Sequence, residues 1–270
     1  MAAHVAIGCS TRMLRGMVFW SLLPFVSVQA LRVRRNAPRL APASGPSSGR
    51  VGSGAAFRLL AIGDSIIAGV GASSLDKALV GRAAEALAGA LGRAVEWHAV
   101  GRSGIDSGGV LGELMGELPA APVDAFLVSV GVNDVTSLRR SSTWERNLSA
   151  LLQALADHSP GAVIAFAGMP PLHGFPLLPQ PLRALIGFRG ETLDRISRTV
   201  IATQPQARHV PVVFPAHADR FCADGFHPSE ASYVDFGQAM ACSVLATLPS
   251  NWQKSVTPPA ETGRMLDALE

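Results

Sequence analysis

Apolar segments alternate with segments of helical spacing along most of the chain. The apolar segments are short and end at Gly, Pro or charged residues, which is typical of strands, and residues 123–130 (VDAFLVSV) are apolar enough for a strand buried on both faces. The segments between them repeat apolar residues three and four positions apart, as amphipathic helices do. We predict strands at residues 57–62, 95–100, 123–130, 161–169 and from 209, and helices at residues 76–91, 110–118, 142–158, 191–204 and 230–248.

This alternation predicts an α/β fold. Because strands that are joined through helices usually run parallel, we expect a mainly parallel, five-stranded sheet with helices on both faces. The chain has 270 residues, of which 48% are hydrophobic and 16% charged, so it can bury a sizeable core.

Residues 1–35 are predicted to be a hydrophobic leader. Residues 17–31 are apolar and follow two arginines, and the segment is shorter than the roughly 20 residues that span a membrane. Three further arginines lie within residues 32–35 and disfavour translocation. The interpretations are a cleaved signal peptide, a short membrane anchor, and a true start at Met13 or Met17. We expect membrane association or export to the cell envelope rather than a free cytoplasmic protein.

Composition also divides the remainder of the chain. Residues 36–56 are rich in Pro, Gly, Ser and Ala and show no periodicity, which predicts a flexible linker. Residues 251–270 likewise predict a flexible tail. The folded domain is therefore expected at residues 57–250.

Charge is distributed unevenly along the chain. Residues 1–56 hold seven of the 23 basic residues and none of the 20 acidic ones, so residues 57–270 are mildly acidic although the net charge of the chain is +3. A nucleic-acid partner is therefore not expected. The three cysteines form neither a disulfide framework nor a metal-binding motif. Cys222 and Cys242 are expected either to pair or to be two small buried apolar residues.

Polar motifs follow four of the five predicted strands. GDS, ending at Ser65, follows the first, and GRSGIDSGG, containing Gly104, follows the second. GVND, containing Asn133, follows the third, and DGFH, with Asp224 and His227, precedes the last helix. Because ligands of open parallel sheets bind beyond the carboxyl ends of the strands, we expect these motifs to lie close together.

These residue types are the ones that nucleophilic catalysis requires. A serine hydroxyl needs a histidine base, and the histidine needs a carboxylate to orient it, which Asp224 and His227 can supply. A tetrahedral intermediate needs hydrogen-bond donors, which the N–H groups of Ser65 and Gly104 and the Asn133 amide can supply. Taken alone, Ser65 is also consistent with a turn residue, and the presence of these partner residues favours the catalytic interpretation.

In their order and spacing, the four motifs resemble the sequence blocks of the SGNH/GDSL hydrolase superfamily, over residues 57–248. The sequence departs from the first block at Ile66, where the family has leucine, an apolar side chain of the same volume. The resemblance implies a flavodoxin-like three-layer α/β/α sandwich and a serine hydrolase of carboxylic esters that uses no metal or organic cofactor. The implied roles are nucleophile for Ser65, base for His227, orienting acid for Asp224, and oxyanion hole for Ser65, Gly104 and Asn133.

Other residues near these motifs are assigned lesser roles. Asp64 and Asp134 are predicted to support their loops rather than to catalyse. His173 lies in the apolar, proline-rich segment 168–188 with no acid within ten residues, and is predicted to contact substrate at the rim of the site. The segment itself is expected to form either the wall of an acyl pocket or part of the core.

The expected partner is a small-molecule ester. No insertion is long enough for a lid domain, which favours small or short-chain acyl groups. Alternatives with the same residues are a carbohydrate O-acetylesterase, a lysophospholipase or thioesterase, and an acyltransferase. A non-catalytic binding module that keeps the fold and a phosphate-binding flavodoxin-like protein are the alternatives outside the hydrolases. The sequence gives no indication of the oligomeric state.

Overall fold

The computed structural model describes residues 26–212, 218–249 and 252. The strands are β1 (Ser48–Val51), β2 (Ala56–Gly63), β3 (Ala94–Gly101), β4 (Ala125–Ser129), β5 (Val163–Ala167) and β6 (Ala207–Val210). The helices are α2 (Leu79–Leu91), α3 (Ser107–Gly112), α4 (Val132–Thr136), α5 (Ser141–His158), α6 (Leu182–Ile201) and α7 (Glu230–Thr247). Residues 26–36 are also helical, and short 3₁₀ turns occupy Leu114–Glu117, Leu172–Gly174 and Ala218–Arg220.

The strands form a single sheet in the order β1-β3-β2-β4-β5-β6. β2 to β6 run parallel to one another, whereas β1 runs antiparallel to β3. The parallel strands alone follow the flavodoxin-like order, in which the direction of winding reverses between the first and third strands. Here those strands are β2 and β4, so the expected ligand crevice lies beyond their carboxyl ends.

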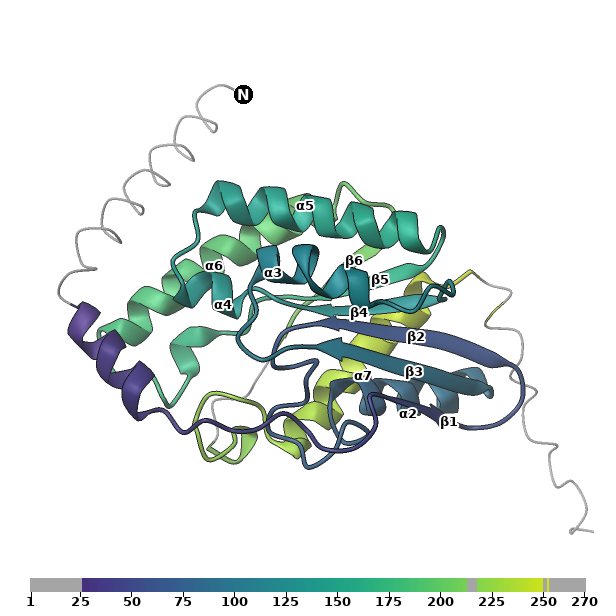
Figure 1. Cartoon of the computed structure of the whole chain (residues 1–270), viewed down its shortest axis with the longest axis horizontal. Coiled ribbons are helices and arrows are strands. Elements are labelled where there is room, and N and C mark those ends of the chain that lie inside the picture. The colour runs from purple at the N-terminus through teal and green to yellow at the C-terminus, as the bar shows by residue number, and fades with distance from the viewer. Residues whose placement is uncertain (1–25, 213–217, 250–251, 253–270) are drawn as a thin grey trace, which may run out of the picture.

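Helices cover both faces of this sheet, with α2 and α7 on one face and α3, α5 and α6 on the other (Figure 1). Successive residues of β2 enter opposite layers: Leu59 packs in the cluster that contains α7 residues, and Leu60 in the cluster that contains α5 residues. Side chains of a strand alternate between its faces, which explains why β2 is buried on both sides. The predicted three-layer α/β/α arrangement is thus confirmed.

The sheet has six strands rather than the five predicted, because β1 lies within residues 36–56, the predicted linker. Arg50 of β1 forms an ion pair with Glu96 of β3 at 2.5 Å. Gly49 lies against the Trp97 ring, where a Cβ would come within 2.5 Å of it. A four-residue strand of small and exposed residues has no hydrophobic alternation, so the sequence pattern does not reveal it.

Other features also differ from the prediction: α4 was not predicted, and α3 begins at Ser107 rather than at residue 110. α6 begins at Leu182 instead of near residue 191, because the prolines of segment 168–188 end at Pro181, just before the helix, and therefore do not interrupt it. Trp252, in the predicted tail, packs edge-on against Phe57 with 5.2 Å between the ring centroids.

The helical residues 26–36, purple in Figure 1, lie beside the start of α6. Gln29 holds them there: its Nε2 donates to the Gln180 carbonyl at 2.8 Å, and its Oε1 accepts from the Leu182 N–H at 3.3 Å. Val26 is 2% exposed and belongs to the core. Residues 1–25, most of the predicted leader, lie outside the described part of the chain. Within that part, no helix is both long and apolar enough to cross a membrane.

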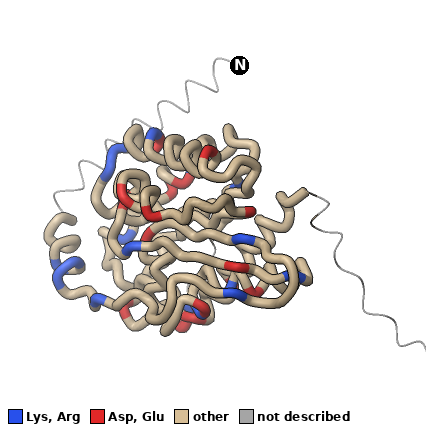
Figure 2. Tube along the Cα trace, turned by 45° about the vertical axis from the view of Figure 1, so that its right-hand side comes forward, with Lys and Arg blue, Asp and Glu red and all other residues tan. Residues whose placement is uncertain are grey.

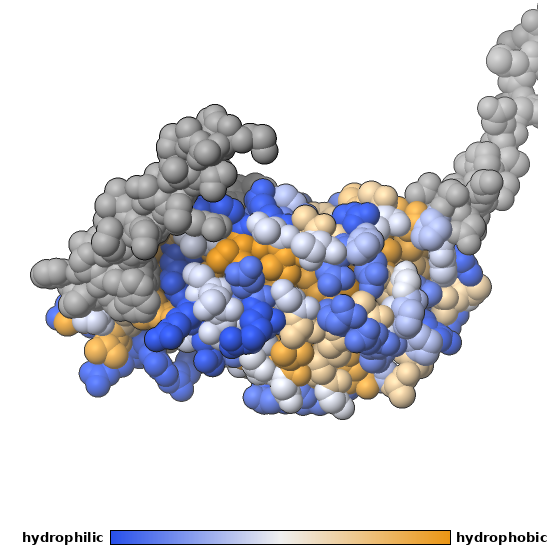
Figure 3. Space-filling model, turned by 90° about the horizontal axis from the view of Figure 1, so that it is seen from above, coloured by the Kyte–Doolittle hydropathy of each residue, from blue (hydrophilic) through white to orange (hydrophobic). Residues whose placement is uncertain are grey.

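Charge and hydropathy vary over the surface. Basic residues gather on the segment that contains residues 26–39, whereas basic and acidic residues are interspersed over the rest of the fold (Figure 2). Hydrophilic and hydrophobic residues are also interspersed on the face shown in Figure 3. The charge asymmetry seen in the sequence is therefore also an asymmetry in space.

Candidate active site

Ser65 directly follows β2, where that strand lies against β4. Gly63, the last residue of β2, has a φ of 152°, and a Cβ there would lie 1.8 Å from the Ser129 carbonyl oxygen, so only glycine fits. The Asp64 N–H donates to the same oxygen at 2.9 Å. These contacts place half-buried Ser65 at the crevice between the ends of β2 and β4.

Asp224 and His227 lie in the loop before α7. Asp224 Oδ1 accepts hydrogen bonds from the N–H groups of Phe226 and His227, both at 2.9 Å, and Oδ2 lies 2.6 Å from His227 Nδ1. Burial opposes ionisation of Asp224, but the hydrogen bonds from the His227 ring and from the two N–H groups outweigh burial and lower the pKa of Asp224. The loop therefore holds a carboxylate against one nitrogen of the imidazole.

The other ring nitrogen of His227 faces Ser65. His227 Nε2 and Ser65 Oγ are 3.1 Å apart, within hydrogen-bonding range. In the tautomer that donates from Nδ1 to Asp224, Nε2 is an acceptor and can take the proton of the serine hydroxyl. Three residues singled out from the sequence thus form one continuous hydrogen-bonded series.

Gly104 and Asn133 line the same cavity as Ser65. Gly104 has a φ of 82°, and a Cβ at this position would meet no atom within 4 Å, so the residue borders open space. The Asn133 amide donates to the Ile105 carbonyl at 2.8 Å, which orients the amide with one of its two N–H bonds. Within the described ranges, the N–H groups of Ser65 and Gly104 have no hydrogen-bond acceptor. Both are therefore available to a ligand.

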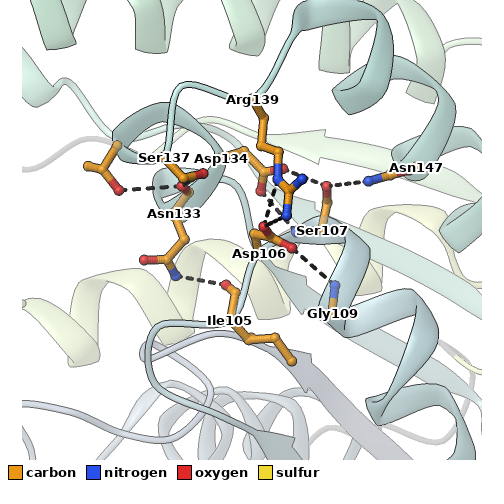
Figure 4. Close-up of polar contacts among 10 residues, drawn as sticks. Ile105, Asp106, Ser107, Gly109, Asn133, Asp134, Ser137, Arg139 and Asn147 are labelled. Carbon is orange, nitrogen blue, oxygen red and sulfur yellow. Dashed lines mark hydrogen bonds and ion pairs between the residues drawn. The ribbon is translucent and has the colours of Figure 1, made fainter.

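A network of polar side chains connects the chain after Gly104 to α4, the helix that contains Asn133, and holds α4 in place (Figure 4). Asp134, in α4, accepts hydrogen bonds from the N–H and the hydroxyl of Ser107 at 2.9 and 2.6 Å. Asp106, the N-cap residue of α3, accepts from the Gly109 N–H at 3.1 Å and from Arg139 Nε at 2.8 Å. The carboxylates of Asp134 and Asp106 therefore join α3, α4 and the chain that follows α4.

Asp64 is buried beneath Ser65 and 2% exposed. Its Oδ1 accepts from the Ile66 N–H at 3.1 Å and from the Ser129 hydroxyl at 3.3 Å. Burial raises the pKa of Asp64 to about 7, because these hydrogen bonds and the nearby His227 ring only partly offset the loss of solvation. Asp64 contacts the strand ends rather than the ring of His227.

The cavity in front of Ser65 has a volume of about 150 Å³ and is mostly apolar, with Met169, Phe175 and Phe226 among its walls. The Met169 N–H donates to Asp194 Oδ1 at 2.8 Å, and the same oxygen lies 2.7 Å from His209 Nε2. Burial opposes ionisation of Asp194, but the hydrogen bonds from His209, the Met169 N–H and Arg198, with the nearby His209 charge, together outweigh burial and lower the pKa of Asp194 to about 2.

Of the wall residues Met169, Phe175 and Phe226, the first two lie in segment 168–188, which the sequence predicted to be either the wall of an acyl pocket or part of the core. No signal in the chain marked Phe226 as a wall. The Asp194–His209 pair joins a helix to a strand 15 residues away in the sequence, and nothing local to either residue indicates the pairing.

Other predicted residues lie away from this centre. The His173 side chain is 62% exposed, lies 4.0 Å from Glu191 and does not line the cavity in front of Ser65, so its contact with substrate stays a prediction. Cys222 and Cys242 are both free, and Cys242 is exposed. Among the described residues, no group of His, Cys, Asp and Glu side chains is arranged to hold a metal ion.

Comparison with known proteins is consistent with this geometry. Residues 61–234 match the GDSL-like Lipase/Acylhydrolase family. The GDSL-like esterase Rv1075c of Mycobacterium tuberculosis is 30% identical in an alignment 186 residues long, which covers 65% of this chain and 58% of the relative. The matched region is therefore less than two thirds of the length of that relative.

Solved structures share the fold at lower identity. The lipase Lip_vut3 from a goat rumen metagenome superposes with a TM-score of 0.57 and 19% identity, over 71% of this chain and 97% of its own. TesA superposes with a TM-score of 0.56 and 23% identity, over 71% of this chain and 99% of its own.

Proposed function

The chain belongs to the GDSL-like lipase/acylhydrolase family, and from this premise we propose that it hydrolyses carboxylic esters with Ser65 as the nucleophile. The observation that carries the proposal is the series Asp224–His227–Ser65, joined at 2.6 and 3.1 Å. A hydroxyl is a weak nucleophile on its own, and a base within hydrogen-bonding reach activates it.

The proposed reaction has two steps. Ser65 Oγ attacks the ester carbon while its proton passes to His227 Nε2; the bond to the leaving oxygen then breaks, and His227 returns the proton to that oxygen, releasing the alcohol. Water attacks the acyl-enzyme in the same way: His227 takes its proton, the bond between Oγ and the acyl carbon breaks, and Oγ regains a proton. The acid is released and Ser65 is restored. Asp224 holds the imidazole and stabilises its protonated form.

The negative oxygen of each tetrahedral intermediate needs donors that are already in position. Ser65, Gly104 and Asn133 line the same cavity, and the N–H groups of Ser65 and Gly104 have no acceptor in the described part of the chain. Donors fixed before the reaction stabilise the developing charge more than solvent does, because they do not have to reorient. We assign Ser65, Gly104 and Asn133 to this role.

Cavity size supports a short acyl group. An apolar cavity of about 150 Å³ in another protein accommodates benzene, a molecule of about six carbons, and the cavity that Ser65 lines is of that size. The acyl group stays attached to Ser65 between the two steps, so it occupies this cavity. Short-chain esters are therefore the proposed substrate class.

The direct test is hydrolysis of p-nitrophenyl acetate by the wild-type chain and by Ser65→Ala. We expect the substitution to lower kcat by a factor of roughly a thousand or more and to leave the far-UV circular dichroism unchanged. A variant that stays folded and keeps most of the activity would move the nucleophile to another residue.

A panel of esters then separates the related activities. Acetylated sugar, lysophospholipid and a thioester, each offered at the same concentration, report which leaving group the enzyme prefers. Transfer of the acyl group to added alcohol in place of water would indicate an acyltransferase.

A further inference from the structure

Two cavities meet beside His227. The smaller, of about 150 Å³, is lined by Ser65. The larger is a groove of about 600 Å³ that is lined by Asp224 and His227 but not by Ser65. Gly104, Asn133, Phe226 and His227 line both. A ligand bound at Gly104 and Asn133 can therefore extend into both cavities.

The helical residues 26–36 form one wall of the groove. Their contribution comes from Ala30, Leu31, Val33 and Arg34. A second wall is formed by Leu177 and Leu178, which precede α6, and by Leu182 and Ile186 at its start. The family match covers residues 61–234, so this wall precedes the part that the chain shares with its family. One wall of the groove therefore lies outside the part of the chain that the family match covers, and the lining residues from Gly104 onwards lie within it.

The wall is attached to the domain rather than merely adjacent to it. Gln29 bonds to the Gln180 carbonyl and to the Leu182 N–H, and Val26 is buried in the core. The residues that face the domain, Val26, Gln29, Val33 and Ala37, recur every three or four positions, as one face of a helix does. The groove therefore has two built sides.

The groove is large enough for a sizeable organic group. Pockets of roughly 300–1,000 Å³ with mainly apolar walls enclose drug-sized ligands in other proteins, and this groove of about 600 Å³ falls in that range. Aliphatic side chains on both walls favour an apolar ligand.

The chemistry of the reaction decides which half of an ester enters each cavity. The acyl half becomes bonded to Ser65, so it lies in the cavity that Ser65 lines. The alcohol half takes a proton from His227 as it leaves. Both cavities are lined by His227, and once the acyl half occupies the cavity that Ser65 lines, the groove is the space left for the alcohol half. We propose that the groove-lining residues of the helix 26–36, together with the start of α6, form the binding site for the alcohol half, and that the substrates are short-chain esters of large, apolar alcohols.

The test compares ethyl acetate, which is short on both sides, with two substrates that are extended on one side only. Decyl acetate is extended on the alcohol side and ethyl decanoate on the acyl side. Ala30→Trp fills the groove from an exposed position of the helix, and Val28→Trp places the same ring on the same helix at a residue that does not line the groove. We expect Ala30→Trp to lower kcat/KM for decyl acetate at least about tenfold, the effect of a methylene-sized misfit in an apolar pocket. Its activity on ethyl acetate and all activities of Val28→Trp should match the wild type.

Gln29→Ala gives a second test that does not depend on filling the groove. Release of the helix from α6 should lower kcat/KM for decyl acetate relative to ethyl acetate, in a protein with an unchanged circular dichroism spectrum. If either helix variant instead impairs ethyl decanoate selectively, or if neither alters the preference for decyl acetate, the assignment of the groove is wrong.

The assignment of the groove to the alcohol half rests on the proposed function, and different results would overturn each of them. Absence of any esterase activity in the wild-type chain, or its persistence in Ser65→Ala, would overturn the proposed function. Wild-type activity that depends on Ser65 but shows no difference between Ala30→Trp and Val28→Trp would overturn the groove alone.

Discussion

The carboxylate of Asp134 accepts two hydrogen bonds from Ser107, at 2.9 Å from the N–H and at 2.6 Å from the hydroxyl. Asp134 and Ser107 are both 0% exposed. Asp134 follows Asn133 in α4, and Ser107 begins the helix after the Gly104 loop, so this contact fixes the spacing between two of the proposed oxyanion donors (Figure 4).

Asp134→Ala should therefore reduce both stability and turnover. The substitution leaves the buried N–H and hydroxyl of Ser107 without their acceptor, which costs about 1–3 kcal/mol of the free energy of unfolding. Urea unfolding measures this loss, and Asp157→Ala, an exposed aspartate on α5, should change stability by less than about 0.5 kcal/mol. For a positioning role, kcat should fall while KM changes little. Equal effects of the two substitutions on stability, or a lower stability with an unchanged kcat, would contradict that role.

Asn133→Ala tests the oxyanion donor directly. Loss of one donor to a developing oxyanion lowers kcat by roughly 10²–10³ in other serine hydrolases, and we expect a similar fall here in steady-state hydrolysis of p-nitrophenyl acetate. Ser149→Ala, at an exposed site on α5 where the hydroxyl bonds only to its own helix, serves as the control. A change in KM with an unaltered kcat would assign Asn133 to substrate binding instead.

Asp64 should make the stability of the protein depend on pH. Its pKa is raised from 3.8 to about 7, so between these values the unfolded chain has lost a proton that the folded chain keeps. The contribution of Asp64 to the free energy of unfolding is therefore fully present below about pH 4 and decreases by up to about 1.4 kcal/mol per pH unit until about pH 7.

Asp64→Asn removes this titration while keeping an oxygen that can accept the Ile66 and Ser129 hydrogen bonds. Urea unfolding at about pH 5 and pH 8 should show that the variant gains stability relative to the wild type as the pH rises. A difference between the two proteins that does not vary with pH would mean that Asp64 is ionised throughout.

The parallel strands and their carboxyl ends could be predicted from the sequence because buried strands leave long apolar runs. Ser65, Gly104, Asn133, Asp224 and His227 all follow or face such ends, so the alternation of strands and helices was enough to bring them together. β1 could not be predicted in this way, since only one of its four residues, Val51, packs against the core and the strand is held by pairing with β3.

The walls of the site were less predictable than its reactive groups. Gln29 contacts Leu182 across 153 positions of the chain, and a composition typical of a leader gives no indication of that contact. His173 shows the reverse case: it lacks an acid nearby in the sequence, but the fold brings Glu191 to 4.0 Å and leaves the ring exposed. Such contacts depend on how helices pack, which short sequence patterns do not encode.

The most direct test of Ser65 as an activated nucleophile is covalent labelling by a fluorophosphonate, followed by intact-mass measurement and peptide mapping. Attack by Ser65 Oγ on phosphorus expels fluoride, so the wild-type chain should gain the mass of one phosphonyl group on the peptide that contains Ser65 and lose esterase activity in parallel. His227→Ala should react roughly 10²–10⁴ times more slowly, because the general base is absent. Labelling at another residue, or an equal rate in His227→Ala, would contradict the assignment of Ser65 and His227.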